Sequence, residues 1–207
     1  MKLYLVRHGQ TEGNVSGIAG LDPPLTDLGI RQARLAGRRL AAEGITHLYG
    51  SPLLRALQTA ELFRETVPLN PAISPLLCEM WGTRWRARTV QELQPLFPWV
   101  RFPDSMNHGR WWPTEEESRE RIFERGREGL DFILQRHPNP RDRVGLISHY
   151  EMGNAMLHSL LKIAPDSDLF FHQRNCAFTC LECSPESTRT LYYLNDAGHL
   201  PEELWTY

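Results

Sequence analysis

The sequence lacks a long hydrophobic run and a strong excess of charge of either sign. No apolar stretch approaches the roughly 20 residues that a membrane-spanning helix needs, so we expect no membrane segment. The formal net charge of −2 gives no reason to expect nucleic acid or an anionic membrane as a partner. The opening segment 1–6 is too short for a signal peptide. We therefore expect a soluble, cytoplasmic protein.

Internal repeats and low-complexity tracts are also absent. A chain of 207 residues can bury a sizeable core without disulfides or metals, and its length favours one domain over two. We expect residues 1–207 to form a single domain.

Cysteine is scarce, and the few cysteines do not indicate a metal cluster. Cys176, Cys180 and Cys183 have the C-x3-C-x2-C spacing of some iron–sulfur loops, and Cys78 stands apart. Their surroundings resemble a strand, on which Cys176 and Cys180 face one way and Cys183 the other. Such residues could not converge on one cluster, so we interpret them as small buried apolar side chains.

Strand-like and helix-like patterns alternate along most of the chain. This alternation predicts an α/β fold in three layers (α/β/α), with a largely parallel central sheet of about six strands and helices on both faces. The expected strands lie at residues 2–6, 45–49, 72–77, 143–147, 177–182 and 189–194. The expected helices lie at residues 26–43, 51–67, 114–136 and 152–163, the second of them opening at Ser51-Pro52.

Residues 80–113 interrupt the alternation, and we expect a small cap insertion there. The segment holds five of the six tryptophans and several arginines: Trp81, Trp85, Trp99, Trp111, Trp112, Arg84, Arg86, Arg88, Arg101 and Arg110. Tryptophans in a cap favour an apolar or aromatic ligand, and arginines favour an acidic one. Alternatively, the tryptophans pack the cap onto the core.

Four segments that follow predicted strands bring cations, histidines and a carboxylate to one edge of the sheet. Arg7 and His8 end the first strand, Arg55 follows the second, Glu79 the third, and His149 the fourth. Ligands of open α/β sheets bind at this carboxyl edge. Guanidinium groups match phosphate oxygens, and a neutral histidine can attack phosphorus. The arrangement predicts a phosphate site.

In these segments the chain resembles the histidine phosphatase superfamily, also called phosphoglycerate-mutase-like, and its phosphatase branch in particular. The matching pieces are Leu5-Val6-Arg7-His8-Gly9-Gln10-Thr11 with Asn14, Pro24-Leu25-Thr26, Ser51-Pro52-Leu53-Leu54-Arg55-Ala56, Leu77-Cys78-Glu79, Glu117-Ser118, Ser148-His149, Asn195-Asp196 and His199-Leu200. Several ordered motifs at family-like spacing make the resemblance specific.

The resemblance implies a role for each residue of the predicted site. His8 would be the nucleophile that accepts the phosphoryl group, and Glu79 the proton donor to the leaving oxygen. Arg7, Asn14, Arg55 and His149 would bind the phosphate, and His149 would also count among the catalytic residues. The resemblance implies no metal and no cofactor, because two guanidiniums provide the positive charge.

These assignments have plain alternatives. Arg7 and Arg55 could form surface ion pairs, and His149 could be a structural histidine. The dipeptide Gly13-Asn14 is common in turns, so Asn14 could serve only a turn. The stretch after Glu79 fits the family pattern only in a shifted register, so Glu79 could be a solvated surface carboxylate.

The substrate is less well defined than the site. Tyr150 stands where the family usually has glycine, and we expect it near the phosphate. Gln10, Thr11, Trp81 and Trp85 complete the expected substrate pocket. The expected partner is a small-molecule phosphate ester, and the sequence leaves the oligomeric state open, a homodimer included.

The sequence predicts a metal-independent phosphomonoester hydrolase that acts through a phosphohistidine. A phosphoglycerate mutase is the alternative, although mutases of the family typically have a longer tail that closes the site, and little chain follows the last strand here. A phosphate-binding module without activity is a third hypothesis, which the complete set of residues disfavours.

Overall fold

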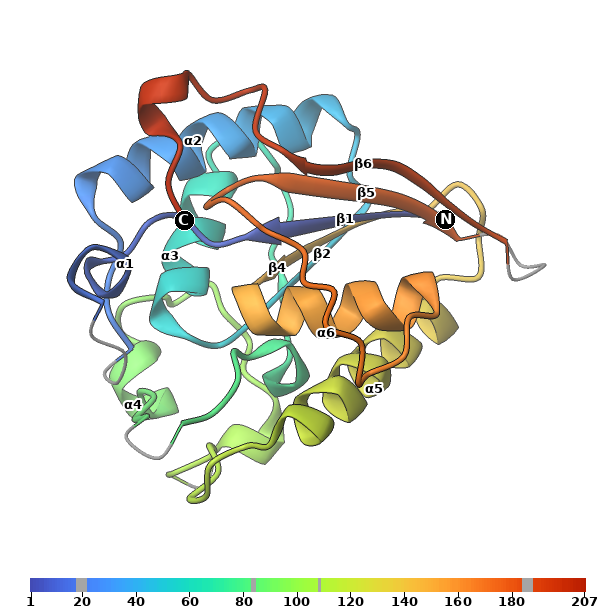
Figure 1. The fold of residues 1–207 in the computed structure, drawn as a ribbon. Coiled ribbons are helices and arrows are strands. Elements are labelled where there is room, and N and C mark those ends of the chain that lie inside the picture. The colour runs from blue at the N-terminus through green and yellow to red at the C-terminus, as the bar shows by residue number, and fades with distance from the viewer. Residues whose placement is uncertain (18–21, 83–84, 108, 184–187) are drawn as a thin grey trace.

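A computed structural model describes residues 1–17, 22–82, 85–107, 109–183 and 188–207. Its centre is a six-stranded sheet in the order β3-β2-β4-β1-β5-β6 (Figure 1). The strands are β1 (Lys2–Arg7), β2 (His47–Gly50), β3 (Ala72–Ile73), β4 (Arg143–Ser148), β5 (Phe178–Cys183) and β6 (Arg189–Asp196). Strands β1 to β4 pair in parallel, whereas β5 runs antiparallel to both β1 and β6.

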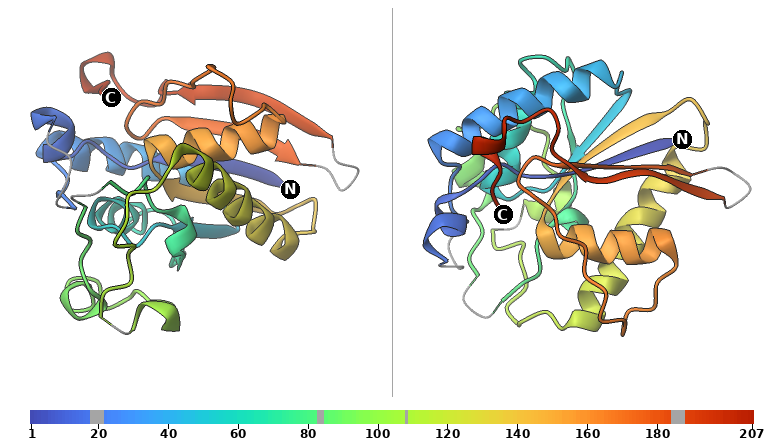
Figure 2. Two further views of the ribbon diagram at one scale, coloured as in Figure 1. Left: turned by 60° about the horizontal axis from the view of Figure 1, so that its bottom comes forward. Right: turned by 45° about the horizontal axis from the view of Figure 1, so that its top comes forward.

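Helices cover both faces of this sheet, which completes the three layers (Figures 1 and 2). Helices α2 (Asp27–Ala42) and α3 (Leu54–Phe63) pack on one face, and α5 (Arg119–Arg136) and α6 (Tyr150–Leu161) on the other. Shorter helices are α1 (Glu12–Ser16) and α4 (Val90–Leu93), with 3₁₀ turns at Pro75–Leu77, Asp104–Met106 and Glu202–Leu204. The predicted α/β class is confirmed.

Strand β1 shows how one short sequence builds both cores. Its side chains alternate, so that Leu3 and Leu5 enter the core under α5 and α6, while Tyr4 and Val6 enter the core under α2 and α3. Burial on both faces explains why this strand is a continuous apolar run.

The free cysteines follow the predicted alternation. Cys176 and Cys180 lie in the core under α2 and α3, and Cys183 lies in the opposite core. Burial raises the pKa of the fourth thiol, Cys78, to about 12. No helix in the described part of the chain is long and apolar enough to cross a membrane.

Several predicted boundaries were wrong, among them the end of the helix expected at 51–67, which stops at Phe63. Strand β3 ends at Ile73 because Pro75 begins a 3₁₀ turn. Helix α3 begins at Leu54, since the hydroxyl of Ser51 accepts a hydrogen bond from the amide of Leu53 and holds the preceding residues in a turn. Helix α5 begins only at Arg119, where Ser118 caps it.

The segment 80–113 packs onto α3 through two small apolar clusters. One joins Leu54 and Leu57 to Leu93, Phe97 and Met106, and the other contains Leu53, Cys78, Trp81, Ala87 and Trp112. Most of the tryptophans therefore hold this segment together, as the packing alternative supposed. Arg84 lies outside the described residues.

Candidate active site

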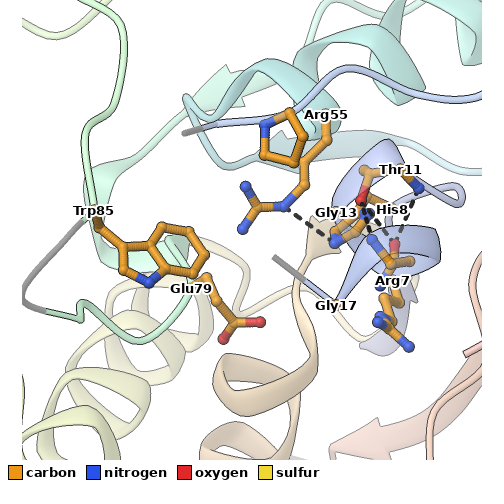
Figure 3. A pocket seen from close by; sticks show the side chains of 10 residues that line it. Arg7, His8, Thr11, Gly13, Gly17, Arg55, Glu79 and Trp85 are labelled. Atoms are coloured by element: carbon orange, nitrogen blue, oxygen red, sulfur yellow. Dashed lines mark hydrogen bonds between the residues drawn. The ribbon is translucent and has the colours of Figure 1, made fainter. Parts of the chain in front are cut away.

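The carboxyl ends of the parallel strands bring the predicted residues together. The register pairs Arg7 with Ser148 and Gly50 with Ile147, so β1, β2 and β4 end at one edge. A cavity of about 330 Å³ opens there (Figure 3). Its lining is Arg7, His8, Thr11, Gly13, Asn14, Gly17, Pro23, Arg55, Glu79 and Trp85.

His8 is held as a neutral imidazole by one hydrogen bond at each ring nitrogen. Its Nδ1 lies 2.7 Å from the carbonyl oxygen of Gly9, to which it donates, and its Nε2 accepts a hydrogen bond from Arg55 Nε at 3.2 Å. Burial lowers the pKa of His8 well below its ordinary range, and the guanidiniums of Arg55 and Arg7 lower it further. Nε2 is thus an unprotonated nitrogen near neutral pH.

Arg7 and Arg55 bring two nearly buried guanidiniums to the cavity. Arg7 Nη1 donates to the carbonyl oxygen of Gln173 at 2.7 Å, while its buried Nε has no partner among the described residues. Converging guanidinium donors are suited to binding an anion, and the neutral imidazole beside them has the chemistry of a nucleophile.

Asp22 anchors Arg55, and sequence reasoning missed it. Its carboxylate accepts from the backbone N–H of Leu54 at 2.8 and 3.0 Å and from Arg55 Nη1 at 3.3 Å, and its side chain is only 3% exposed. Asp22 thereby fixes both the start of α3 and the guanidinium on it. An acid in a loop gives no local signal of this role, because its partners lie more than thirty residues away.

The carboxylate of Glu79 sits on the N-terminus of α6. Its oxygens accept from the backbone N–H groups of Tyr150 and Glu151, both at 3.0 Å, of Met152 at 3.3 Å and of Met80 at 2.9 Å. A helix N-terminus favours negative charge. These bonds aim Glu79 into the cavity, where it lies opposite the two arginines (Figure 3).

The backbone around Glu79 is clamped by Arg125 of α5, another residue that sequence reasoning missed. Its guanidinium donates to the carbonyl oxygens of Leu76, Cys78 and Glu79 at 2.7–3.1 Å. It also forms a buried ion pair with Glu117 at 2.6 Å. This pair explains why α5 begins later than predicted: Glu117 is held outside the helix.

His149 lies behind the nucleophile as the N-terminal cap of α6. The ring centroids of His149 and His8 are 5.1 Å apart. Burial lowers the pKa of His149, and Arg55 and His8 add to the effect. Both of its ring nitrogens are buried without a hydrogen-bond partner in the described structure, and His149 does not belong to the described cavity lining.

Asn14 has the local turn role that the plain alternative supposed, and it also faces the cavity. It lines the cavity and closes a capping box at α1, in which its Oδ1 accepts from the N–H and the hydroxyl of Thr11 at 3.0 and 2.9 Å. Neither bond uses the side-chain amide nitrogen, which is the donor that a phosphate oxygen would need.

The expected substrate pocket is only partly assembled. Thr11 and Trp85 line the cavity, and the Trp85 ring lies 5.1 Å from Arg55 Cζ. Gln10, Trp81 and Tyr150 do not belong to the described lining.

Each of these three side chains has another partner. Gln10 Oε1 accepts from the hydroxyl of Thr26 at 2.7 Å, so that it stabilises the start of α2. Trp81 is buried within segment 80–113, in the small apolar cluster that also contains Ala87 and Trp112. The Tyr150 ring stands 5.2 Å from Arg7 Cζ, beside the anion site, and its hydroxyl contacts His172 at 3.3 Å.

The fold is that of an α/β protein, and its cavity brings a buried histidine together with two arginines and a carboxylate. A sequence model of the histidine phosphatase superfamily (branch 1) matches residues 3–196. The chain is 32% identical over 182 residues to a probable phosphoglycerate mutase, GpmB, of Yersinia enterocolitica, covering 86% of this chain and 83% of that one.

Solved structures agree with this match. A mycobacterial glucosyl-3-phosphoglycerate phosphatase in complex with VO3 is 26% identical, with a TM-score of 0.71 over 95% of this chain and 99% of that chain. A phosphoserine phosphatase of Entamoeba histolytica, 24% identical with a TM-score of 0.72 over 97% and 99% of the chains, shares the fold. The chain belongs to the histidine phosphatase superfamily (branch 1).

Proposed function

We propose that the protein is a metal-independent phosphomonoester hydrolase that works through a phosphohistidine at His8. The observation that carries this proposal is the buried, neutral His8, whose Nε2 lone pair faces a cavity between two guanidiniums. A phosphoryl group needs positioning and charge stabilisation more than covalent assistance, and these residues are suited to both.

In the first step, Arg7, Arg55, Asn14 and His149 bind the phosphate oxygens. His8 Nε2 attacks phosphorus, the bond from phosphorus to the ester oxygen breaks, and protonated Glu79 gives that oxygen its proton. Arg55 exchanges its hydrogen bond to His8 for one to the phosphate, which frees the lone pair for attack.

In the second step, water attacks the phosphohistidine. The carboxylate of Glu79 takes a proton from the water, the phosphorus–nitrogen bond breaks, and inorganic phosphate leaves with His8 neutral again. One carboxyl group can serve both steps because each returns it to the state that the other requires. Two easier displacements thus replace one difficult one.

The substrate is a small phosphorylated molecule whose leaving group contacts Trp85. This ring forms a wall of the cavity beside Arg55, so an apolar or aromatic group gains contact area there. The mycobacterial relative, named a phosphatase and solved with VO3, supports hydrolysis at such a site.

Hydrolysis of p-nitrophenyl phosphate in excess chelator tests the proposal. We expect turnover by the native protein, turnover at the chemical background for His8→Ala, and unchanged turnover for His47→Gln, which removes a histidine at the far edge of the sheet. Absence of native activity, or full activity of His8→Ala, would contradict the proposal.

Phosphoglycerate mutase activity is the second candidate, favoured by the Yersinia relative. Phosphorus NMR with 3-phosphoglycerate separates the two. Growth of the inorganic phosphate signal supports the hydrolase, whereas faster appearance of 2-phosphoglycerate supports the mutase.

A further inference from the structure

A group of side chains that could hold a metal ion lies at the opposite edge of the sheet from His8. His47, His137 and Asp142 are the one such group of three found in the described residues, and their ligand atoms all lie within 4.8 Å of one another. His47 is the first residue of β2, and Asp142 directly precedes β4. The amino ends of parallel strands meet here, near the N-terminus in Figure 1.

His137 and Asp142 already have the separation of two ligands on one metal ion. His137 Nδ1 and Asp142 Oδ2 are 3.2 Å apart. Zinc bonds of about 2.0–2.1 Å in tetrahedral geometry place neighbouring ligand atoms about 3.3 Å apart. A zinc ion could therefore take the place of the proton between them with little movement of either side chain.

Tyr49 orients the His137 ring from behind. Its hydroxyl lies 2.8 Å from His137 Nε2. A hydroxyl can donate or accept, so it can accept from Nε2–H when Nδ1 binds a metal. Hydrogen bonding of the second ring nitrogen is the usual support of a metal-binding histidine.

His47 completes the group from the solvent side. Its ring centroid is 4.2 Å from that of His137, and the side chain is exposed, so it gives a metal access and can rotate to meet it. Thr46 holds this ring through a 2.9 Å contact to Nδ1 and binds the backbone of Arg143. The neighbouring cation, Arg136, is directed onto the Phe132 ring at 3.6 Å.

We propose that His47, His137 and Asp142 form a binding site for Zn²⁺ or a similar first-row divalent ion. Two imidazoles and one carboxylate are the donor set that such ions prefer over Mg²⁺ or Ca²⁺. The ion joins the start of β2, the end of α5 and the start of β4, and water fills the fourth position. Because the site is remote from the cavity, its role is to brace the fold, and it takes no part in the phosphoryl transfer proposed above.

Titration of chelator-stripped protein with Zn²⁺ against a chromophoric zinc indicator tests the site. We expect one tight equivalent per chain, at least tenfold weaker binding in His47→Gln and in Asp142→Asn, and a rise of Tm with Zn²⁺ in the native protein that both variants lose. His172→Gln, which removes an exposed histidine near the cavity, is the matched control and keeps native binding.

His8→Ala separates this site from the catalytic cavity, and it too keeps native binding. The proposal is overturned if the native protein binds no tight equivalent, or if His47→Gln binds as tightly as the native protein. It is also overturned if His8→Ala or His172→Gln loses the equivalent, because the metal then lies elsewhere. None of these outcomes depends on phosphatase activity.

Discussion

At the scale of single residues, the site depends on groups that hold its cations and its carboxylate in place. Asp22 is the clearest case, because its buried carboxylate contacts Arg55 and the first amide of α3 at once. Burial raises the pKa of Asp22, and the guanidinium of Arg55 opposes that rise. Removing one partner of this buried ion pair would therefore leave the other charge without compensation.

Asp22→Asn should lower kcat about 10- to 100-fold with little change in KM. A hydrogen bond to a charged group contributes about 1.5–3 kcal/mol, and misdirecting Arg55 loses that amount where charge develops on the phosphoryl oxygens. Steady-state kinetics measure the effect, with the exposed Asp104→Asn as control. A change confined to KM would show that Asp22 does not position a catalytic group.

Glu79→Gln should separate the two chemical steps. p-Nitrophenolate leaves without a proton, so phosphorylation of His8 stays fast, whereas water attack loses its base and slows about 10²-fold or more. Stopped-flow absorbance should then show a burst of about one p-nitrophenolate per chain. Glu151→Gln is the matched control, and a slow linear trace without a burst would contradict the role of Glu79.

At the scale of elements, the loop that follows His8 packs against α2 where Gly9 meets Gly29. A Cβ added to Gly29 would lie 2.0 Å from the carbonyl oxygen of Gln10, and one added to Gly9 would lie 2.5 Å from that of Gly29. Only glycine permits this approach of helix and loop.

Gly29→Ala should therefore unfold at a lower urea concentration, at a cost of about 1–3 kcal/mol, and lose most of its activity. Gly50→Ala is the control, since its added methyl would meet side-chain carbons only at 3.6 Å or more. Equal stability of the two variants would show that the contact of α2 with the loop is not a constraint.

The sequence predicted elements well where burial patterns are local. The alternation marked β1, β4, α2 and α6, and the strand ends marked Arg7, His8, Arg55, Glu79 and His149. Asp22 and Arg125 could not be found, because loop carboxylates and helix arginines reveal their partners only after folding. For the same reason the sequence did not reveal the partners of Gln10 and Trp81, which are Thr26 and the apolar cluster of segment 80–113.

At the scale of the whole molecule, two neutral histidines are buried among cations, which makes stability depend on pH. The folded-state pKa values of His8 and His149 are lowered, so below about pH 6.5 the unfolded chain binds protons that the folded chain excludes. The free energy of unfolding therefore has its full value above that pH and decreases as the pH falls below it.

Below pH 6.5, each of these histidines should lower the free energy of unfolding by up to about 1.4 kcal/mol for every pH unit. Urea unfolding at several pH values measures this slope in the native protein and in His8→Ala, where it should be shallower. His172→Gln, which removes an exposed histidine, serves as the control. An identical slope in His8→Ala would contradict a buried, neutral His8.

Trapping the covalent intermediate tests the central claim most directly. The protein is mixed with substrate carrying a radiolabelled phosphoryl group and quenched in alkali, where a phosphorus–nitrogen bond survives. The account predicts a label that is stable in alkali, labile in acid, mapped to His8 and absent from His8→Ala. Steady release of phosphate with no label on His8 would contradict it.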